Sequence, residues 1–398
     1  MKIKGVFLAA ILTAVLCFSG NVFAVALEGG GTEANPYLIQ SRSDFDEFAN
    51  PANSAIYWAG GVYTKLMCDP NLAGTTYTQA PIAPDTYNGM NSGFQGTQFA
   101  GVFDGNGHTI SNLTISQPTK DYIGLFGYVS SGGQINNIGV ENSNLTGRMY
   151  VGGLVGDNRS GLITACYATG SISGTYPVGG LVGDNYDGTI TACYTTGLVS
   201  GSEHVGGLVG YNYGGGMLTD CYSTGSVSGS RYIGGLIGQI NSGTLIACYS
   251  TGSVSGLGWD VGGLVGLNDS GTLTSCYATG SVNSIGGAVG GLVGCSSGNY
   301  GIDILTSCYA TGSVSGADHV GGLIGVTYVS ALTSCYATGS VNGTGVDIGG
   351  LVGLNSSSEL TSCYATGSVS GLGWGDVGGL VGLNDSGRLT SCYATGLV

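Results

Sequence analysis

Charged residues are scarce in this chain of 398 residues, since only 8% are Asp, Glu, Lys or Arg, against about 25% in typical soluble domains. The few that occur are mostly acidic, with nine Lys and Arg against 23 Asp and Glu and a net charge of −14. An acidic surface repels phosphate backbones and anionic lipid headgroups. We therefore expect neither nucleic acid nor a bare anionic membrane as a partner.

Proline is also rare, at seven residues, and the abundant glycine follows no strict G-X-Y period, which excludes a collagen-like triple helix. Glycine accounts for 79 residues, and each one costs a helix about 1 kcal/mol relative to alanine. A mainly helical fold is therefore excluded. Disorder is excluded as well, because 42% of the residues are apolar and 24 are tyrosine, which is enough to build a core. An ordered, glycine-punctuated chain rich in β-structure remains.

The first 24 residues have the pattern of a secretory signal peptide. Lys2 and Lys4 precede a mostly apolar run over residues 6–18, and Val22-Phe23-Ala24 places small residues at the two positions that signal peptidase recognises. The apolar run has 13 residues, too few to span a bilayer, which needs about 20. We predict cleavage after Ala24 and a mature chain that is secreted or displayed at the cell surface, with no membrane span.

A repeat organises most of the chain. The block V-G-G-L-V-G recurs at spacings of 27 to 31 residues, and a degenerate copy covers residues 123–127. A second block, C-Y-[AST]-T-G, follows in phase. The first paired glycines of the first block are Gly152, Gly179, Gly206, Gly234, Gly262, Gly290, Gly321, Gly349 and Gly378. The cysteines of the second block are Cys166, Cys193, Cys221, Cys248, Cys276, Cys308, Cys335, Cys363 and Cys392.

A period near 28 residues is typical of a β-coil built from two or three short strands. Gly, Asn, Asp and Ser bound each apolar stretch, and these residues favour tight corners. Stacked coils form parallel ladders about 4.8 Å apart, and parallel crossovers are almost always right-handed. The predicted fold class is all-β: a right-handed parallel β-helix, or β-solenoid, of about ten coils of about 28 residues, with an N-terminal cap.

In-register stacking turns each repeated side chain into a ladder. The leucine of G-G-L forms one expected apolar ladder, from Leu154 to Leu380, and the valine of S-V-S-G another. Strand alternation lets only one residue of each Cys-Tyr pair face inward, and the sequence alone leaves that choice ambiguous. We place the cysteine inward and the tyrosine outward, because a narrow coil favours the smaller residue.

Residues 25–98 lack the repeat and are predicted to form the N-terminal cap and the first strands, ahead of the solenoid repeats at 99–398. The stretch Asp44–Phe48 is compatible with a short helix. A cap of this kind protects the unpaired edge of the end coil. At the other end the sequence stops in mid-repeat at Val398, so either it is a fragment or a partner covers that edge.

The two repeated blocks resemble the GLUG-motif repeats of bacterial surface and secreted proteins. The segment Phe99–Leu113 resembles the stretch that opens such arrays, and Gly31-Thr32 with Pro36–Ile39 resembles their first strand. The resemblance implies an extracellular, often adhesin-like β-solenoid. Similar repeats also flank immunoglobulin A-degrading peptidase domains, but the only three histidines of this chain form no H-E-x-x-H motif. The peptidase activity therefore does not carry over.

The cysteines suggest a packing role. Of the 12 cysteines, nine form the ladder, Cys17 leaves with the signal peptide, and Cys68 and Cys295 stand outside. Exported proteins often pair their cysteines, but ladder neighbours lie about 4.8 Å apart, whereas a disulfide needs about 3.8 Å between Cβ atoms. We expect reduced, core-filling thiols, with some disulfides as the alternative. No C-x-x-C spacing supports a zinc site.

Two sets of aromatic residues are the candidate binding residues. The outward tyrosines could stack on sugar rings or contact a protein partner, or they could simply stabilise the coil. Trp259 and Trp374 share one position of the repeat, in a variable turn where we expect exposure, although repeat duplication alone would give the same pattern. The tyrosines that we select from the middle of the array are Tyr277, Tyr309, Tyr336 and Tyr364.

Acidic residues recur at two positions of the repeat. Asp260, Asp347 and Asp376 share one turn, and Asp157 and Asp184 lie on neighbouring coils. A sugar-cleaving site needs clustered acids, or an oxygen cage for Ca²⁺ with a basic residue nearby. None of the array arginines shares the repeat position of these acids. We interpret the acids as solvated turn residues, with weak Ca²⁺ binding or catalysis as alternatives. We expect no other cofactor, no metal site and no catalytic residue.

Other polar residues receive structural interpretations. His204 and His319 occupy the same variable turn as Asp260 and are interpreted in the same way. The asparagine of G-x-N, as in Asn158 and Asn185, is interpreted as a stacked corner residue whose amide bonds the next turn.

Two classes of function remain. The first is a non-catalytic extracellular solenoid that adheres to a glycan, or to a host or neighbouring surface protein, through repeated weak contacts. The second is a polysaccharide-active enzyme on the same fold, and a passive spacer or a fragment of a larger surface protein completes the alternatives. An acidic cluster with a neighbouring Arg or Lys on one face favours the enzyme. A spacer predicts no exposed aromatic strip.

Overall fold

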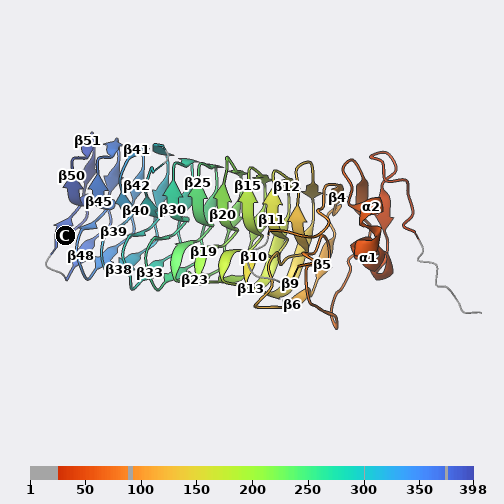
Figure 1. Cartoon of the computed structure of the whole chain (residues 1–398). Coiled ribbons are helices and arrows are strands. Elements are labelled where there is room, and N and C mark those ends of the chain that lie inside the picture. Colours follow the sequence, from red (N-terminus) through yellow and green to blue (C-terminus); the bar gives the residue numbers. More distant parts are fainter. Residues whose placement is uncertain (1–25, 88–92, 300, 373–374) are drawn as a thin grey trace, which may run out of the picture.

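A computed structural model describes residues 26–87, 93–299, 301–372 and 375–398. The chain forms an elongated rod of stacked β-coils, with two α-helices at its N-terminal end and the C-terminus at the other end (Figure 1). The ladder strands pair in parallel from coil to coil, so the predicted all-β parallel β-solenoid is confirmed. The predicted signal peptide with its cleavage site at Ala24, and Trp374, lie outside the described residues.

The longest sheet, sheet A, has 13 strands. Three of them precede the degenerate first repeat at residues 123–127, so the solenoid begins earlier than the repeat does. It has about 12 coils, slightly more than predicted. The strands of sheet A are β1 (Tyr37–Ile39), β2 (Tyr63–Leu66), β4 (Val102–Asp104), β8 (Gln134–Asn136), β12 (Leu162–Thr164), β16 (Thr189–Thr191), β21 (Met217–Thr219), β26 (Thr244–Ile246), β31 (Thr272–Thr274), β36 (Asp303–Thr306), β41 (Ser330–Thr333), β46 (Glu359–Thr361) and β51 (Arg388–Thr390).

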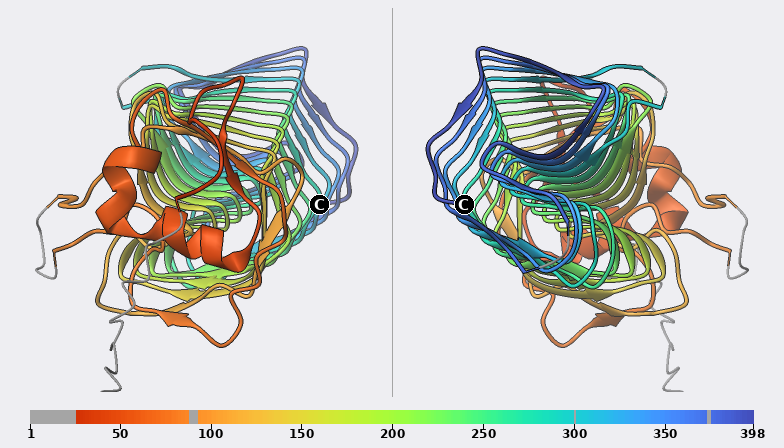
Figure 2. Two further views of the ribbon diagram at one scale, coloured as in Figure 1. Left: turned by 90° about the vertical axis from the view of Figure 1, so that its right-hand side faces the viewer. Right: turned by 90° about the vertical axis from the view of Figure 1, so that its left-hand side faces the viewer.

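One coil, residues 261–284, illustrates the array. Sheet E, with nine strands, contributes one strand, and sheet D, with ten, contributes the next. Sheet A follows, and sheet C supplies the last two strands. In order these strands are β29 (Val261–Gly262), β30 (Val265–Asp269), β31, β32 (Tyr277–Ala278) and β33 (Val282–Ser284). The sequence predicts two or three strands per coil, whereas the coil has five, because both repeated blocks bend in the middle. Viewed along the axis, successive coils superimpose (Figure 2).

Left-handed backbone at non-glycine residues marks the corners of the coil. The φ angle is +64° at Asp260, before β29, +63° at Ser270, between β30 and β31, and +54° at Ser275, between β31 and β32. Aspartate and serine are short, and such residues tolerate the left-handed region better than branched ones. Equivalent positions in other coils, such as Tyr232 and Ser242, share this conformation. The corners therefore stack as regularly as the strands.

Glycine is required where the first block folds back on itself between β29 and β30, a bend that we call the elbow. Gly266 lies in β30 just after the elbow, and a Cβ atom added to it would lie 2.5 Å from the backbone nitrogen of Ile233 in the preceding coil. Contacts that short do not occur in packed interiors. The elbow brings the residue that precedes V-G-G close to an outward-facing residue on the strand after the bend. His204 and Tyr211 are such a pair, and their ring centroids lie 5.1 Å apart.

Apolar ladders fill the rod. The leucines of G-G-L are fully buried from Leu154 to Leu351, and the ladder cysteines are fully buried from Cys166 to Cys363. The adjoining tyrosines stay partly exposed on the outer surface, so the predicted inward cysteine and outward tyrosine are confirmed. Cys276 Sγ donates to the carbonyl oxygen of Thr274 at 3.3 Å. The hydrogen bond with the Cys248 thiol, together with burial, raises the pKa of Cys276 to about 12, so it is an unreactive thiol.

Asparagine side chains form a second kind of ladder at the corner after sheet D. Asn158 Nδ2 donates to Asn185 Oδ1 in the next coil at 2.7 Å, and also to the carbonyl oxygen of Gly161 in its own turn at 3.2 Å. Asn185 repeats the first contact with Asn212 at 2.7 Å. Ile240 interrupts the ladder in the following coil. The interpretation of these asparagines as stacked corner residues is confirmed.

Two short α-helices cover the N-terminal end of the rod. Helix α1 (Arg42–Ala49) begins after Ser41, whose hydroxyl accepts a hydrogen bond from the backbone nitrogen of Asp44 at 3.2 Å, a standard N-cap. A 3-10 helix (Pro51–Asn53) and α2 (Ser54–Tyr57) follow. Phe45, Phe48 and Trp58 are buried in the same core as the coils. The expected short helix near Asp44–Phe48 is therefore present, at the end of the rod where a cover is needed.

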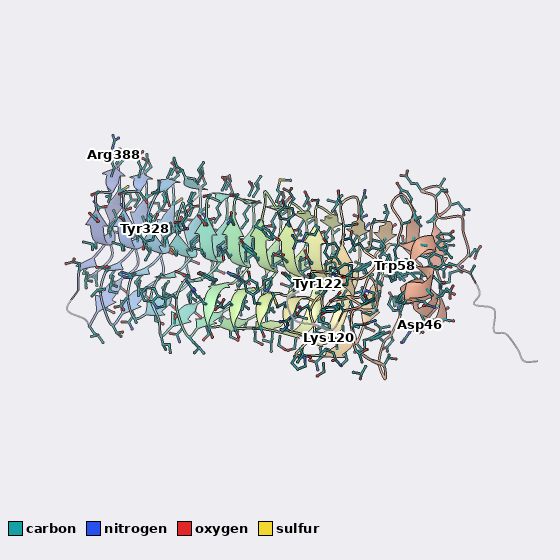
Figure 3. All side chains as sticks on the ribbon, viewed as in Figure 1. Asp46, Trp58, Lys120, Tyr122, Tyr328 and Arg388 are labelled. Carbon is teal, nitrogen blue, oxygen red and sulfur yellow. The ribbon has the colours of Figure 1, made fainter. Side chains whose placement is uncertain are left out.

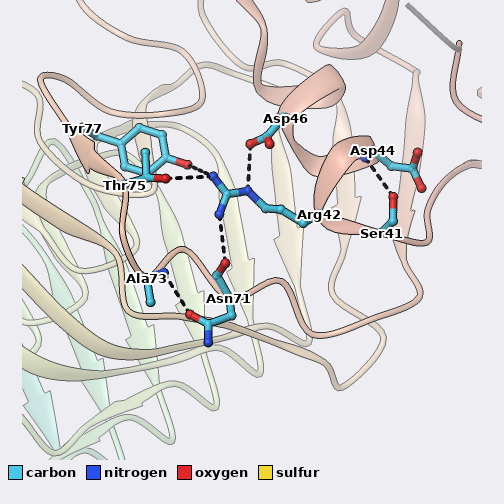
Figure 4. A network of polar contacts seen from close by, with 8 residues as sticks. All are labelled: Ser41, Arg42, Asp44, Asp46, Asn71, Ala73, Thr75 and Tyr77. Carbon is cyan, nitrogen blue, oxygen red and sulfur yellow. Dashed lines mark hydrogen bonds and ion pairs between the residues drawn. The ribbon is translucent and has the colours of Figure 1, made fainter.

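Arg42 ties helix α1 to the edge of the first coils (Figure 4). Its guanidinium donates to the carbonyl oxygen of Asn71 at 2.9 Å, to Thr75 Oγ1 at 3.3 Å and to the Tyr77 hydroxyl at 3.2 Å. Its Nε also pairs with Asp46 at 2.9 Å. One side chain thus connects the helix with a loop that packs against sheet C.

We predict that Gly266→Ala destabilises the protein by about 2 kcal/mol, the usual effect of overpacking a closed interior, because the new methyl group meets backbone atoms of the preceding coil. Gly93→Ala is the matched control, since nothing lies within 4 Å of a Cβ at that position. Urea unfolding followed by circular dichroism measures both. Equal stability of the two variants would contradict the packing role of the elbow.

Candidate functional site

The outward tyrosines form one continuous stack along sheet C. Neighbouring ring centroids are 4.8–5.2 Å apart and the ring planes are within 2–6° of parallel. The stack runs from Tyr167 to Tyr393 and includes the four candidate binding residues Tyr277, Tyr309, Tyr336 and Tyr364.

Stacking limits what this ladder can present to a partner. Each ring face inside the stack is covered by the next ring, so a sugar cannot lie flat on Tyr277 or Tyr309. Ring edges and hydroxyl groups remain available. Burial raises the pKa of Tyr277, Tyr336 and Tyr364, so their hydroxyls are protonated hydrogen-bond donors at neutral pH. The ladder is therefore a row of regularly spaced hydroxyls.

Exposed apolar side chains line the corner after the last strand of sheet C. Trp259 is 51% exposed, as expected for its variable turn, and Ile285 and Leu372 are 71% and 81% exposed. Leu257 follows β28 (Val254–Gly256) as Ile285 follows β33, in the next coil. We call Leu257, Trp259, Ile285 and Leu372 the apolar corner. Strand β13 (Tyr167–Ser173) is long enough to pair with both sheet C strands of the next coil, β17 (Tyr194–Thr195) and β18 (Leu198–Ser200). The strands that carry the tyrosines and the strands that precede the apolar corner therefore belong to one sheet.

A buried acidic pair lies near the N-terminal end of the array. Asp157 on β11 (Val155–Arg159) and Asp184 on β15 (Val182–Tyr186) are neighbours in register, and both carboxylates are fully buried. Arg159 joins them, with its Nε 2.8 Å from Asp157 Oδ1 and its Nη2 3.4 Å from Asp184 Oδ2. Oδ1 of Asp184 has no hydrogen-bond partner among the described residues.

Tyrosines lie near this pair and its arginine. Tyr122 and Tyr150 stack with ring centroids 4.7 Å apart, and the Arg159 guanidinium lies 5.2 Å from the ring centre of Tyr186 and 5.6 Å from that of Tyr213, within cation–π range. We call Tyr122, Tyr150, Asp157, Arg159, Asp184, Tyr186 and Tyr213 the acid–aromatic cluster. Figure 3 shows Tyr122 in the part of the rod nearer the helical end.

Burial sets the charges in the cluster. It raises the pKa of both carboxyl groups, and the charge of Asp157 raises that of Asp184 further. Two carboxyl groups share one guanidinium, so the pair retains a proton at a higher pH than solvated aspartates do. Burial also raises the pKa of Tyr150 to about 12.

The interpretation of Asp157 and Asp184 as solvated turn residues is therefore wrong. Their basic partner was missed because the arginines were compared only with acids at the same repeat position. Side chains two residues apart on a strand point to the same side, and Arg159 follows Asp157 by two residues. This i, i+2 pattern was the sequence feature that could have revealed the cluster.

Other predicted turn residues are buried as well. His204 is only 7% exposed and is stacked between Tyr211 and Tyr232, with interplanar angles of 15° and 14°. Burial lowers the pKa of His204 to about 4, so it is neutral at pH 7. Asp260 and Asp347 are also buried, whereas Asp376 is exposed as expected. The elbow causes this burial, because it folds these residues against the neighbouring strand.

His319 and Asp347 each precede the elbow in two neighbouring coils near the C-terminal end of the rod. His319 Nδ1 lies 2.7 Å from Asp347 Oδ2. The described residues contain no group of three His, Cys, Asp or Glu side chains arranged to hold a metal ion. They also contain no helix long and apolar enough to cross a membrane.

Comparison with known families agrees with the repeat. Five stretches match the GLUG motif, and together they cover about a third of the chain: residues 147–173, 201–228, 258–283, 344–370 and 375–398. Each stretch corresponds to about one coil. The chain is thus a parallel β-solenoid that carries GLUG motif repeats, and the resemblance seen in its sequence is confirmed.

Two curated relatives match parts of the chain. Halomucin of Haloquadratum walsbyi is 34% identical over 39% of this chain, and a candidate Gly-rich membrane protein of Evansella cellulosilytica is 31% identical over 33% of it. The matched parts span only 2% and 14% of those proteins.

A solved structure of a candidate immunoglobulin A1 protease from Bacteroides ovatus is also similar, with a TM-score of 0.47 and 24% identity over 64% of this chain and 79% of that one. This level of similarity carries no argument about function.

We predict that Asp260→Asn stabilises the protein by on the order of 2 kcal/mol at pH 7. Burial raises the pKa of Asp260 to about 6, above about 3.9 for an unfolded chain. The folded state therefore binds the proton more tightly, and the stability contributed by this group falls as pH rises from about 4 to about 6. Asparagine does not titrate, so the variant does not lose this stability as the pH rises.

Urea unfolding at several pH values measures the effect. Asp187→Asn is the control, because Asp187 is exposed and has a left-handed backbone like that of Asp260. A pH profile for Asp260→Asn that matches the unmodified protein would refute the assignment.

Proposed function

We propose that this protein is a non-catalytic, extracellular β-solenoid that binds a glycan or protein surface through sheet C and the apolar corner. The observation that carries the proposal is the exposure of Trp259, Ile285 and Leu372 on one corner of the coils in the second half of the array. Exposed apolar side chains that gather on one part of a soluble protein mark interaction sites.

The geometry of sheet C supports a repetitive partner. The tyrosine hydroxyls follow one another at the spacing of the coils, and serine and asparagine side chains lie between them and the corner, such as Ser315, which donates to Asn283 Oδ1 at 2.9 Å. A partner with its own regular repeat can contact several coils at once. Repeated weak contacts of this kind add up to strong attachment.

An extracellular location is part of the proposal. Residues 1–24 have the pattern of a signal peptide, and the names of the two relatives refer to a mucin-like and a membrane protein. The unreactive, buried cysteine ladder is compatible with an oxidising environment, because thiols of this kind oxidise slowly.

The enzymatic alternative has one observation in its favour, since Asp157, Asp184 and Arg159 form an acidic cluster with a basic neighbour on one face. Their burial argues against it. Both carboxylates are inaccessible, and both are engaged by the guanidinium. A general acid or nucleophile must reach its substrate within hydrogen-bond distance. We therefore interpret the cluster as structural.

We predict that Trp259→Ala with Ile285→Ala loses at least half of the retention of the protein on its partner surface. The measurement is a pull-down on a panel of insoluble polysaccharides and immobilised extracellular-matrix proteins. Tyr328→Ala is the matched control, because Tyr328 is an exposed aromatic residue outside the apolar corner. Circular dichroism confirms that each variant is folded.

Retention that is equal in the double variant and the control would show that the apolar corner is not the contact site. Retention on none of the surfaces would favour the passive spacer.

A further inference from the structure

A cleft lies on the outer face of sheet A, next to the cap, far along the chain from the apolar corner. Its volume is about 750 Å³, within the range of small-ligand sites. The strands β1, β2, β4, β8 and β12 form its floor, and Glu33 and Ala34 close one end. In Figure 1 these strands are those nearest the helical end of the rod.

Strand register builds a polar row along the floor. Lys65 pairs with Asp104, Asp104 with Asn136 and Asn136 with Thr164, and all four side chains are half-buried. Neighbouring members are about 4.8 Å apart. The row therefore presents an ammonium, a carboxylate, an amide and a hydroxyl in succession, so donors and acceptors follow each other in one line.

These groups keep hydrogen-bonding capacity for a ligand. Lys65 Nζ is 3.7 Å from Asp104 Oδ2, and Asn137 Nδ2 donates to Asp104 Oδ1 at 3.3 Å. Neither the Asn136 nor the Gln134 amide bonds to any other side chain that the structure describes. An amide that donates and accepts in one plane is suited to a pair of adjacent hydroxyl groups.

Apolar side chains lie directly beside the polar row. Tyr63 and Val102 are neighbours in register on the same floor, with the Gln134 amide next in their row, and Leu38 and Met67 complete the apolar lining. A sugar ring has the matching chemistry, with hydroxyl groups at its rim and C–H groups on its faces. Aromatic and aliphatic side chains pack against such faces.

We propose that this cleft binds the end of a neutral, linear polysaccharide, with Asn136, Gln134 and Lys65 bonding its hydroxyl groups and Tyr63 packing against a ring. The proposal goes beyond the function suggested for the apolar corner, because it assigns a separate site at the other end of the rod. Glu33 and Asp104, together with the net charge of −14, disfavour anionic polysaccharides.

The chain of the ligand can continue along the rod. Thr164 pairs in register with Thr191, and Thr191 with Thr219, so the polar row passes from the cleft into a row of threonine hydroxyls on the same face. Long oligosaccharides therefore bind more tightly than short ones. A globular protein would gain nothing from this continuation, which is why the geometry favours a linear polymer.

Isothermal titration calorimetry with soluble neutral oligosaccharides of the cellulose, xylan, mannan, chitin and β-1,3-glucan types tests the proposal. We expect Asn136→Ala and Lys65→Ala each to weaken binding about tenfold, the usual effect of losing one well-placed hydrogen bond. Thr361→Ala is the matched control, because Thr361 occupies the same register position far from the cleft, beyond Ile246, which interrupts the threonine row. Thermal unfolding confirms that the variants are folded.

A second variant tests the continuation. Thr191→Val keeps the shape of the side chain and removes the hydroxyl, so it should weaken binding of a hexasaccharide and leave that of a disaccharide unchanged. Trp259→Ala should bind these oligosaccharides normally, which separates this site from the apolar corner.

Three results would overturn the proposal: no binding of any neutral oligosaccharide, binding that survives both Asn136→Ala and Lys65→Ala, or tighter binding of anionic oligosaccharides than of neutral ones. Capture of a globular protein that is lost in Asn136→Ala, without oligosaccharide binding, would assign the cleft to a protein partner instead.

Discussion

Parallel stacking in register places every side chain of one coil about 4.8 Å from its equivalent in the next. A residue type can therefore occupy a repeated position only if it is compatible with a copy of itself. Leucine satisfies this condition by apolar contact and cysteine by its small volume. Tyrosine does so by ring stacking, and asparagine by amide-to-amide hydrogen bonds, such as that from Asn158 to Asn185 at 2.7 Å. The regular core and the regular surface follow from the same requirement.

The features that this requirement controls were predictable from the sequence. Residues that recur at the same position of the repeat predict the period and the leucine ladder. They also predict the inward cysteine with its outward tyrosine. The elbow was not predictable in the same way. V-G-G-L-V-G resembles one strand, and only the structure shows that it bends, because its two halves, β29 and β30, belong to different sheets. The burial of His204 and Asp260 depends on that bend, so their environment could not be inferred from residue type.

The candidate sites depend on contacts between coils that differ in sequence. The acid–aromatic cluster depends on Asp157 and Arg159, which are two residues apart on one strand and therefore face the same side. A comparison of equivalent positions in different repeats does not reveal such a pair. The cleft is harder to predict, because Lys65, Asp104 and Asn136 are far apart in the sequence and share no motif. Their alignment becomes visible only when the register of β2, β4 and β8 is known. Chemistry that arises between non-identical coils leaves little trace in the repeat.

The same requirement accounts for the scarcity of charge. A charged residue repeated in every coil would face a like charge at about 4.8 Å, which costs about 3.5 kcal/mol per pair at an effective dielectric constant of 20. Charges accordingly occur where the repeat varies and often beside an opposite charge, as Arg388 does beside Glu359 at 3.7 Å. Asp157 and Asp184 do stack on each other, but burial raises the pKa of both carboxyl groups and a guanidinium joins them. The polar row of the cleft accordingly lies in the irregular coils next to the cap, whereas the regular coils carry the tyrosine ladder and the apolar corner on their surface. One rod can thus carry two different kinds of contact surface along its length.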